Sequence, residues 1–242
     1  MYLPGKIMKA GSSSDNTAVG PSLNTTYVLD MTQPAPGWQQ TPSMAYPRTF
    51  LNLVTLPDGT VLAVGGETDT YGGNIANAVY PAELWSPQTQ TWTTMAAMQT
   101  PREYHATAIL LPDGRVLVSG MGADFGKVPD QKSAEFFSPP YLFKGARPTI
   151  SQVPAQISYG ANFFVGTPDA SSITRAVLIR TGGVTHFFDG NARYVPLTFQ
   201  QSTGGLTLSA PANANLAPPG YYLLFILNNA GIPSVAPFVQ LQ

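Results

Sequence analysis

The chain of 242 residues contains no cysteine. That absence excludes disulfides, thiolate metal sites and a cysteine nucleophile from these residues, and it leaves the redox compartment open. Charge is also scarce, because charged residues make up 10% of the chain and the formal net charge is −1. With no basic stripe and no acidic tail, the sequence predicts no nucleic-acid partner.

Long apolar runs are missing as well. No apolar stretch approaches the roughly 18 residues that a membrane span needs, and the first residues, MYLPGK, do not have the layout of a signal peptide. Turn-forming residues are abundant instead, with 23 glycines and 23 prolines beside a hydrophobic content of 43%. This composition predicts no membrane span and an all-β chain of short strands around an adequate core.

An internal repeat occupies the first part of the chain. Residues 48–66 read RTFLNLVTLPDGTVLAVGG, and residues 102–120 read REYHATAILLPDGRVLVSG. Each copy is an apolar run, a Pro-Asp-Gly turn and a second apolar run that ends in glycine, which is typical of a β-hairpin. A weaker copy, KIMKAG at residues 6–11, precedes them, and Trp38 and Trp92 recur at the same late position.

A repeat of about 54 residues with four short strands, a glycine pair and a late tryptophan resembles a kelch-type propeller blade. The alternative is that Leu-Pro-Asp-Gly is only a common turn, but two copies in register with glycines and tryptophans favour the blade. We count about three blades, of which the first lacks its innermost strand. Propellers close with about 4–8 blades, so we expect a partner: the remaining blades, from the same precursor or from a second subunit.

The repeat stops after Phe143, and residues 144–148 form a linker. Seven strand-like runs follow, separated by turns, and they predict an immunoglobulin-like β-sandwich. The expected strands are 149–152, 162–165, 175–181, 194–199, 206–209, 221–228 and 238–241. The predicted fold is therefore all-β, with a partial kelch propeller at residues 1–143 and an immunoglobulin-like sandwich at residues 144–242.

The chain has two histidines. His105 follows Tyr104 on the expected innermost strand of a blade, where side chains project toward the propeller axis. His186 lies between Gly182-Gly183 and Asp189-Gly190, which bracket a hairpin, so we expect it near a loop tip. A lone histidine in such a loop is usually only a polar loop residue. Two imidazoles and a phenolate would suit Cu(II), although neighbours on a regular strand point to opposite sides.

At Tyr104-His105 the sequence resembles the copper-radical oxidase family, that of galactose oxidase and glyoxal oxidase. The resemblance covers nearly the whole chain and is most specific over residues 100–242. It is carried by YHATAILLPDGRVLVSG, FFSPPYLF with RPTI, LIRTGGVTHFFDGNAR and APPGYYLLFILNNAGIPSVA. The family has a seven-bladed kelch propeller followed by an immunoglobulin-like domain, and a loop of that domain delivers a histidine to copper in the propeller channel.

The resemblance implies a role for each candidate residue. Tyr104 would be the axial copper ligand and the base that accepts the proton of the substrate alcohol, and His105 and His186 would be equatorial copper ligands. Arg48 falls where the family has a substrate-contacting arginine, and Tyr80 is a candidate aromatic on the substrate side. Family members oxidise primary alcohols or aldehydes and reduce O2 to hydrogen peroxide. An extracellular or cell-surface location is expected by the same analogy.

The chain departs from the family in one respect. The family's radical resides on a second tyrosine that is crosslinked to a cysteine, and this chain has no cysteine. It can supply three of four protein ligands to one copper ion, and the Tyr-Cys radical cofactor cannot form within it.

Three hypotheses follow. The chain is the C-terminal portion of an oxidase acting on a small alcohol, aldehyde or sugar with O2 once it is completed. Alternatively it is a non-catalytic structural or carbohydrate-binding surface protein on the same scaffold. The third hypothesis is an assembly subunit that completes a propeller with another gene product.

Overall fold

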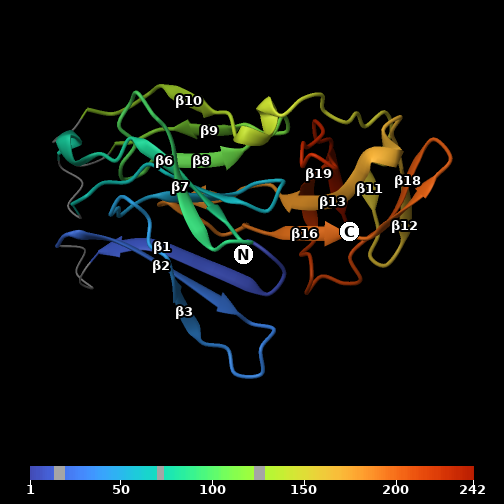
Figure 1. Ribbon diagram of the computed structural model, residues 1–242, viewed down its shortest axis with the longest axis horizontal. Helices are drawn as coiled ribbons and strands as arrows, with labels where there is room; N and C mark the ends of the chain where they lie inside the picture. Colours follow the sequence, from blue (N-terminus) through green and yellow to red (C-terminus); the bar gives the residue numbers. More distant parts are fainter. Residues whose placement is uncertain (14–19, 70–73, 123–128) are drawn as a thin grey trace.

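The computed structural model describes residues 1–13, 20–69, 74–122 and 129–242. Over these ranges the chain is built from β-strands with three short 3₁₀ helices, η1 (Ile75–Asn77), η2 (Pro140–Phe143) and η3 (Ala170–Ser172), and has no α-helix. Figure 1 shows small antiparallel sheets at one end and a sandwich at the other. This confirms the all-β prediction.

The second repeat forms a four-stranded blade. Its sheet has the order β4 (Asn52–Thr55), β5 (Val61–Val64), β6 (Pro81–Ser86) and β7 (Thr91–Ala97), and every neighbouring pair is antiparallel. The turn between β4 and β5 is the Pro-Asp-Gly motif: Leu56 N donates to Thr60 O over 2.9 Å, and Gly59 has a φ of 87°. The Asp58 carboxylate accepts from Thr60 N and stabilises this turn.

In the described residues, the two flanking blades have three strands each. The first contains β1 (Lys6–Ser13), β2 (Ser22–Asp30) and β3 (Trp38–Thr41), and the third contains β8 (Thr107–Leu110), β9 (Val116–Ser119) and β10 (Ala134–Phe137). The innermost strands β4 and β8 lie side by side. β1 lies at the edge of its sheet, as the missing innermost strand of the first blade predicts.

The glycine pair allows close backbone contacts, between the second and third blades at Gly65 and within the second blade at Gly66. Gly65 and Gly66 both have positive φ, 72° and 89°. A Cβ on Gly65 would lie 2.6 Å from the Arg102 carbonyl oxygen, and one on Gly66 would lie 2.5 Å from the Thr49 carbonyl oxygen. Only glycine fits such contacts at these backbone angles. Apolar side chains fill the space between the second and third blades, among them buried Val54, Leu62 and Val118.

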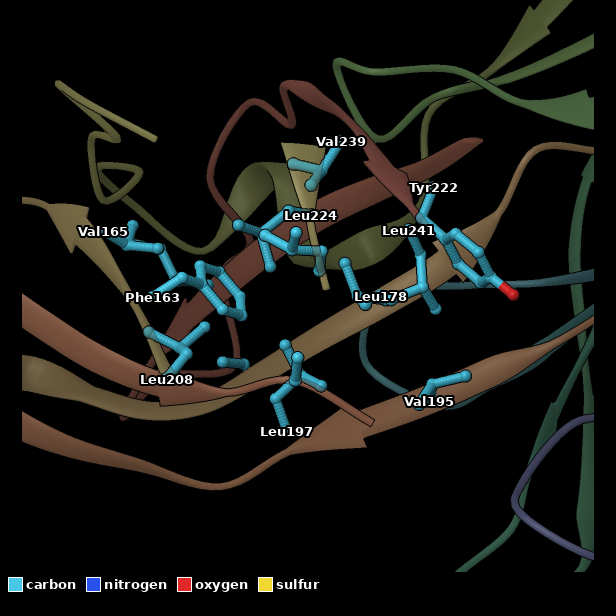
Figure 2. Close-up of a cluster of buried hydrophobic side chains, with 14 of the residues drawn as sticks. Phe163, Val165, Leu178, Val195, Leu197, Leu208, Tyr222, Leu224, Val239 and Leu241 are labelled. Atoms are coloured by element: carbon cyan, nitrogen blue, oxygen red, sulfur yellow. The ribbon is translucent and has the colours of Figure 1, made fainter. Parts of the chain in front are cut away.

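The second half of the chain is a two-layer sandwich. One sheet has the order β11 (Gln156–Ile157), β20 (Phe238–Leu241), β19 (Gly220–Asn228), β13 (Ile173–Arg180) and β16 (Tyr194–Leu197). The other has β12 (Asn162–Gly166), β18 (Gly205–Ser209) and β17 (Phe199–Ser202). Their facing side chains form the core in Figure 2, with Val165, Leu178 and Leu224 fully buried.

Two strand predictions need correction. Residues 149–152 form no strand, because only an isolated bridge joins Gln152 to Gly166 and Pro154, which has no N–H, follows closely. The predicted strand 194–199 is divided, since the chain leaves one sheet after Leu197 and enters the other at Phe199. The short strand β11 was not predicted.

Side chains of the sandwich bind the carbonyl oxygens of both Pro-Asp-Gly turns. Arg147 donates to Asp113 O over 2.7 Å and also to Pro233 O and Ser234 O, over 2.8 and 2.6 Å. Arg175 donates to Asp58 O over 2.8 Å. Leu110 of the third blade packs on the apolar cluster of the sandwich that includes Phe225. The two halves are therefore joined by directional bonds as well as by apolar contact.

Replacing Arg147 should weaken this junction. The Arg147→Ala variant loses three hydrogen bonds from a charged donor, so we expect the free energy of unfolding to fall by about 3 kcal/mol, measured by urea denaturation. Arg115→Ala is the matched control, because Arg115 makes a partly exposed ion pair with Asp113 and its loss should cost less than about 1 kcal/mol. Equal losses in the two variants would contradict this role.

Candidate metal centre

The three predicted ligands lie at the junction of the two halves. Tyr104 and His105 lie in a turn that ends one residue before β8, so the prediction that His105 lies on the innermost strand itself is wrong. His186 lies at the tip of a hairpin formed by β14 (Val184–Thr185) and β15 (Phe188–Asp189). In this hairpin β14 contacts β8 and β15 contacts β4. The hairpin of the sandwich therefore runs along the innermost strands of two blades.

The rings of the three residues are close together. The centroids of Tyr104 and His105 are 3.8 Å apart, and their planes are stacked at 30°. The His105 and His186 rings are 5.0 Å apart at 77°, and Tyr104 and His186 are 6.0 Å apart. His105 and His186 are 81 residues apart in the chain (186 − 105). Their imidazoles and the phenol of Tyr104 nevertheless lie in one region.

The backbone at His105 explains how adjacent residues share one side. His105 has a φ of 64°, so the chain is in the left-handed region and the alternation of a regular strand does not apply. Ala106 N donates to Glu103 O over 3.0 Å and closes a turn around the pair. Phe50, which the repeat aligns with Tyr104, precedes β4 with a φ of 60°, so a left-handed residue comes before the innermost strand in both copies, one position apart.

Hydrogen bonds orient both imidazoles. The Nδ1 atom of His105 lies 3.1 Å from Gly122 O. Because a carbonyl oxygen only accepts, this Nδ1 carries the proton and Nε2 has the lone pair that can bind a metal. The Nδ1 atom of His186 lies 2.7 Å from the Thr185 hydroxyl, which can donate or accept, so this bond engages Nδ1 without fixing the tautomer.

The turn that carries His186 has an unfavourable backbone. His186 and Phe187 are the two central residues of a two-residue hairpin turn, with φ values of 49° and 58°. This is the type I′ geometry, which normally uses Asn-Gly. Each ordinary residue in the left-handed region costs roughly 1–2 kcal/mol. The base of the hairpin is fixed by the Asp189 carboxylate, which accepts from Gly183 N and Asn191 N.

Two phenylalanines that the sequence did not single out surround the site. Phe50 lies 4.8 Å from Tyr104 and 5.1 Å from Phe187, and Phe187 lies 6.2 Å from Tyr104, all between ring centroids. Both phenylalanines also border a trough of about 710 Å³ that runs along β1. For Phe50 a signal was available in the sequence, because the register of the repeat aligns it with Tyr104.

Arg48 lies inside its own blade. Its guanidinium is fully buried and pairs with Glu83 over 2.6 Å, while donating to Gly65 O and Pro81 O over 3.1 and 3.0 Å. Burial lowers the pKa of Arg48, and Glu83 opposes that shift. Arg102 and Glu135 form the corresponding, longer pair in the third blade, at 3.7 Å. This environment is that of a structural ion pair, and the substrate contact predicted for Arg48 stays a prediction.

Tyr80 lies immediately before β6. Its side chain is partly buried, and its carbonyl accepts from Met98 N over 2.9 Å. In the part of the chain that the structure describes, its ring takes no part in the aromatic contacts that join Tyr104, His105 and His186. Its role on the substrate side also stays a prediction.

The comparisons with known proteins cover both halves. The family model described as "Glyoxal oxidase N-terminus" matches residues 4–141, and "Galactose oxidase-like, Early set domain" matches residues 147–241. The chain therefore belongs to the galactose oxidase and glyoxal oxidase family of copper-radical oxidases, and its all-β, galactose oxidase-like fold with an immunoglobulin-like early set domain is confirmed.

Particular relatives are oxidases of fungi and plants. The chain is 30% identical over 246 residues to a galactose oxidase of Gibberella zeae, covering 98% of the chain and 36% of that protein. It is 32% identical over 233 residues to the aldehyde oxidase GLOX of Vitis pseudoreticulata, covering 87% and 44%. A solved fungal alcohol oxidase of the AA5 family in complex with copper superposes with a TM-score of 0.91 at 30% identity, covering 100% and 53%. The chain thus spans about half or less of the length of these relatives.

The donor set in this chain suits copper. Tyr104, His105 and His186 offer two imidazoles and a phenol. Among the described residues no group of three or more His, Cys, Asp and Glu side chains is placed to hold a metal ion. Nitrogen and oxygen donors of this kind match the preference of Cu(II), and the Gly122 carbonyl fixes the tautomer of one imidazole. The residues present therefore fit a copper ion.

The buried position of Arg48 leads to a prediction. Arg48→Met leaves the Glu83 carboxylate buried without its partner, so we expect a loss of about 3–5 kcal/mol in the free energy of unfolding, measured by denaturant titration. The double variant Arg48→Met/Glu83→Leu should recover part of that loss, because no unpaired charge then remains. An Arg48→Met variant of unchanged stability would argue instead for a residue that is free to contact substrate.

Proposed function

We propose that this chain is the copper-binding C-terminal portion of a copper-radical oxidase. In the completed protein it would oxidise a primary alcohol or an aldehyde and reduce O2 to hydrogen peroxide. The observation that carries the proposal is the convergence of Tyr104, His105 and His186 from two different domains, in a member of a copper oxidase family.

Each side chain has a task in this proposal. His105 and His186 would hold the copper ion through Nε2, with their Nδ1 atoms bonded to Gly122 O and the Thr185 hydroxyl. Tyr104 would accept the hydroxyl proton of the substrate at its phenolic oxygen. Copper, when bound, supplies a one-electron redox change, and a radical tyrosine supplies the second. The alcohol loses two electrons and two protons in total. O2 takes up these two electrons and two protons and becomes hydrogen peroxide.

The radical tyrosine must come from outside this chain. Its crosslink needs a cysteine, and these 242 residues have none. The proposed partner is therefore the remaining set of propeller blades, from the same precursor or from a second subunit. The edge position of β1 supports this partner. In the second blade the equivalent strand is β5, and all four of its residues are buried. In β1, by contrast, Ile7 and Met8 are partly exposed along the trough.

The alternative is a non-catalytic surface protein that binds carbohydrate or has a structural role. One observation favours it: the Lys9 ammonium lies over the rings of Tyr27 and Trp38, and Trp38 is 48% exposed, so a flat aromatic surface faces outward. For either function we propose an extracellular or cell-surface location. Among the described residues no helix is long and apolar enough to cross a membrane.

Turnover of the completed protein tests the proposed reaction. Tyr104→Phe removes the phenolic oxygen but keeps the ring, so we expect kcat to fall by about 10²- to 10⁴-fold with little change in stability. Hydrogen peroxide formed from primary alcohols and from glyoxal-type aldehydes is the measurement, and Tyr221→Phe, at an exposed tyrosine, is the control. Unchanged turnover in Tyr104→Phe would refute the base role, and no peroxide from the completed wild type would favour the non-catalytic alternative.

A further inference from the structure

An aromatic contact joins the tip of the β14–β15 hairpin to the second blade. The ring of Phe187 lies 5.1 Å from that of Phe50 at an interplanar angle of 47°. This separation is within the range of favourable aromatic pairs. Phe50 in turn lies 4.8 Å from Tyr104, so the contact connects the hairpin to the residue pair that faces His186.

The position of Phe187 in the turn gives this contact its importance. Phe187 and His186 are the two central residues of one tight turn, so a rotation of the tip that displaces the Phe187 ring also displaces the His186 imidazole. With φ at 58°, Phe187 occupies a conformation that glycine would adopt without strain. A bulky residue persists in such a conformation only where its surroundings hold it there.

Hydrogen bonds and close packing hold the base of the hairpin. The Asp189 carboxylate bonds backbone groups at Gly183 and Asn191, and Gly182 packs closely on Ile109. His186 is exposed on the hairpin tip. Among the described residues, the rings that approach Phe187 are those of Phe50 and Tyr104.

We propose that Phe50 and Phe187 form a clamp that positions the His186 imidazole against His105 across the boundary between the two domains. Phe187 is a positioning residue, because it acts through His186 and has no metal-binding atom. The metal-binding consequence rests on the proposed function, whereas the clamp itself is a property of the metal-free chain.

Nuclear magnetic resonance of the metal-free, histidine-labelled chain tests the clamp. The chain has two histidines, so single substitutions assign both imidazoles. With ring centroids 5.0 Å apart, we expect a nuclear Overhauser effect between the two rings in the wild type. It should disappear in Phe187→Ala and in Phe50→Ala, and it should persist in Phe187→Tyr, which keeps the ring. Phe188→Ala is the matched control, since Phe188 is the next residue and is 68% exposed.

Copper affinity is the second readout. An aromatic pair of this kind is equivalent to roughly a two- to tenfold change in an equilibrium constant, so Phe187→Ala should raise the Kd for Cu(II) by about that factor. The double variant Phe50→Ala/Phe187→Ala should bind about as well as the weaker single variant, because each single variant already removes the contact between the two rings. Phe188→Ala should bind like the wild type.

The outcomes separate the two proposals. The clamp is overturned if the Overhauser effect persists in both alanine variants, or if Phe188→Ala abolishes it as completely as they do. The amide spectrum of the sandwich core should be unchanged and verifies that each variant is folded. If one alanine variant does not fold, the other is sufficient for the test. If the Overhauser effect is present in the wild type and lost in the alanine variants, but the wild type does not bind Cu(II), the proposed function is refuted and the clamp is confirmed.

Discussion

The structure depends on the hydrogen bonds by which the sandwich binds the Pro-Asp-Gly turns of the blades. Arg175 bonds the carbonyl of Asp58, and Arg147 bonds that of Asp113, so one arginine of the second domain holds each copy of the repeated turn. The repeat therefore has two uses, because its turn closes a hairpin and also presents a carbonyl at a fixed place. This docking sets the base of the β14–β15 hairpin beside β4 and β8 and so determines where His186 can reach.

Backbone strain is concentrated at the point where the two domains meet. Phe50, His105, His186 and Phe187 all have positive φ, and their side chains, with Tyr104, form one group of rings. In isolation each of these conformations is unfavourable for a residue with a Cβ. The surrounding contacts offset that cost, and strain of this kind is typical of sites that must hold side chains in one arrangement. The convergence of the two imidazoles is thus built into the fold of the polypeptide.

Much of the fold was predictable because turn chemistry and strand alternation are local. The Pro-Asp-Gly hairpins, the sandwich strands from Asn162 onward apart from the divided stretch 194–199, and the hairpin position of His186 all follow from nearby residues. The left-handed backbone at His105 and the contact between Phe50 and Phe187 do not, because each is decided by residues distant in the chain. Arg48 illustrates the limit: the resemblance implies a substrate contact, which stays a prediction, while the buried ion pair with Glu83, on another strand, could not be foreseen from nearby residues.

The central claim is that two imidazoles from different domains hold one metal ion. Electron paramagnetic resonance of the chain with one equivalent of Cu(II) and ¹⁵N-labelled histidine tests it most directly. The account predicts hyperfine coupling to two imidazole nitrogens on a single copper, reduced to one nitrogen in His105→Ala and likewise in His186→Ala. Coupling to a single imidazole in the wild type, or a spectrum unchanged by both substitutions, would contradict the account.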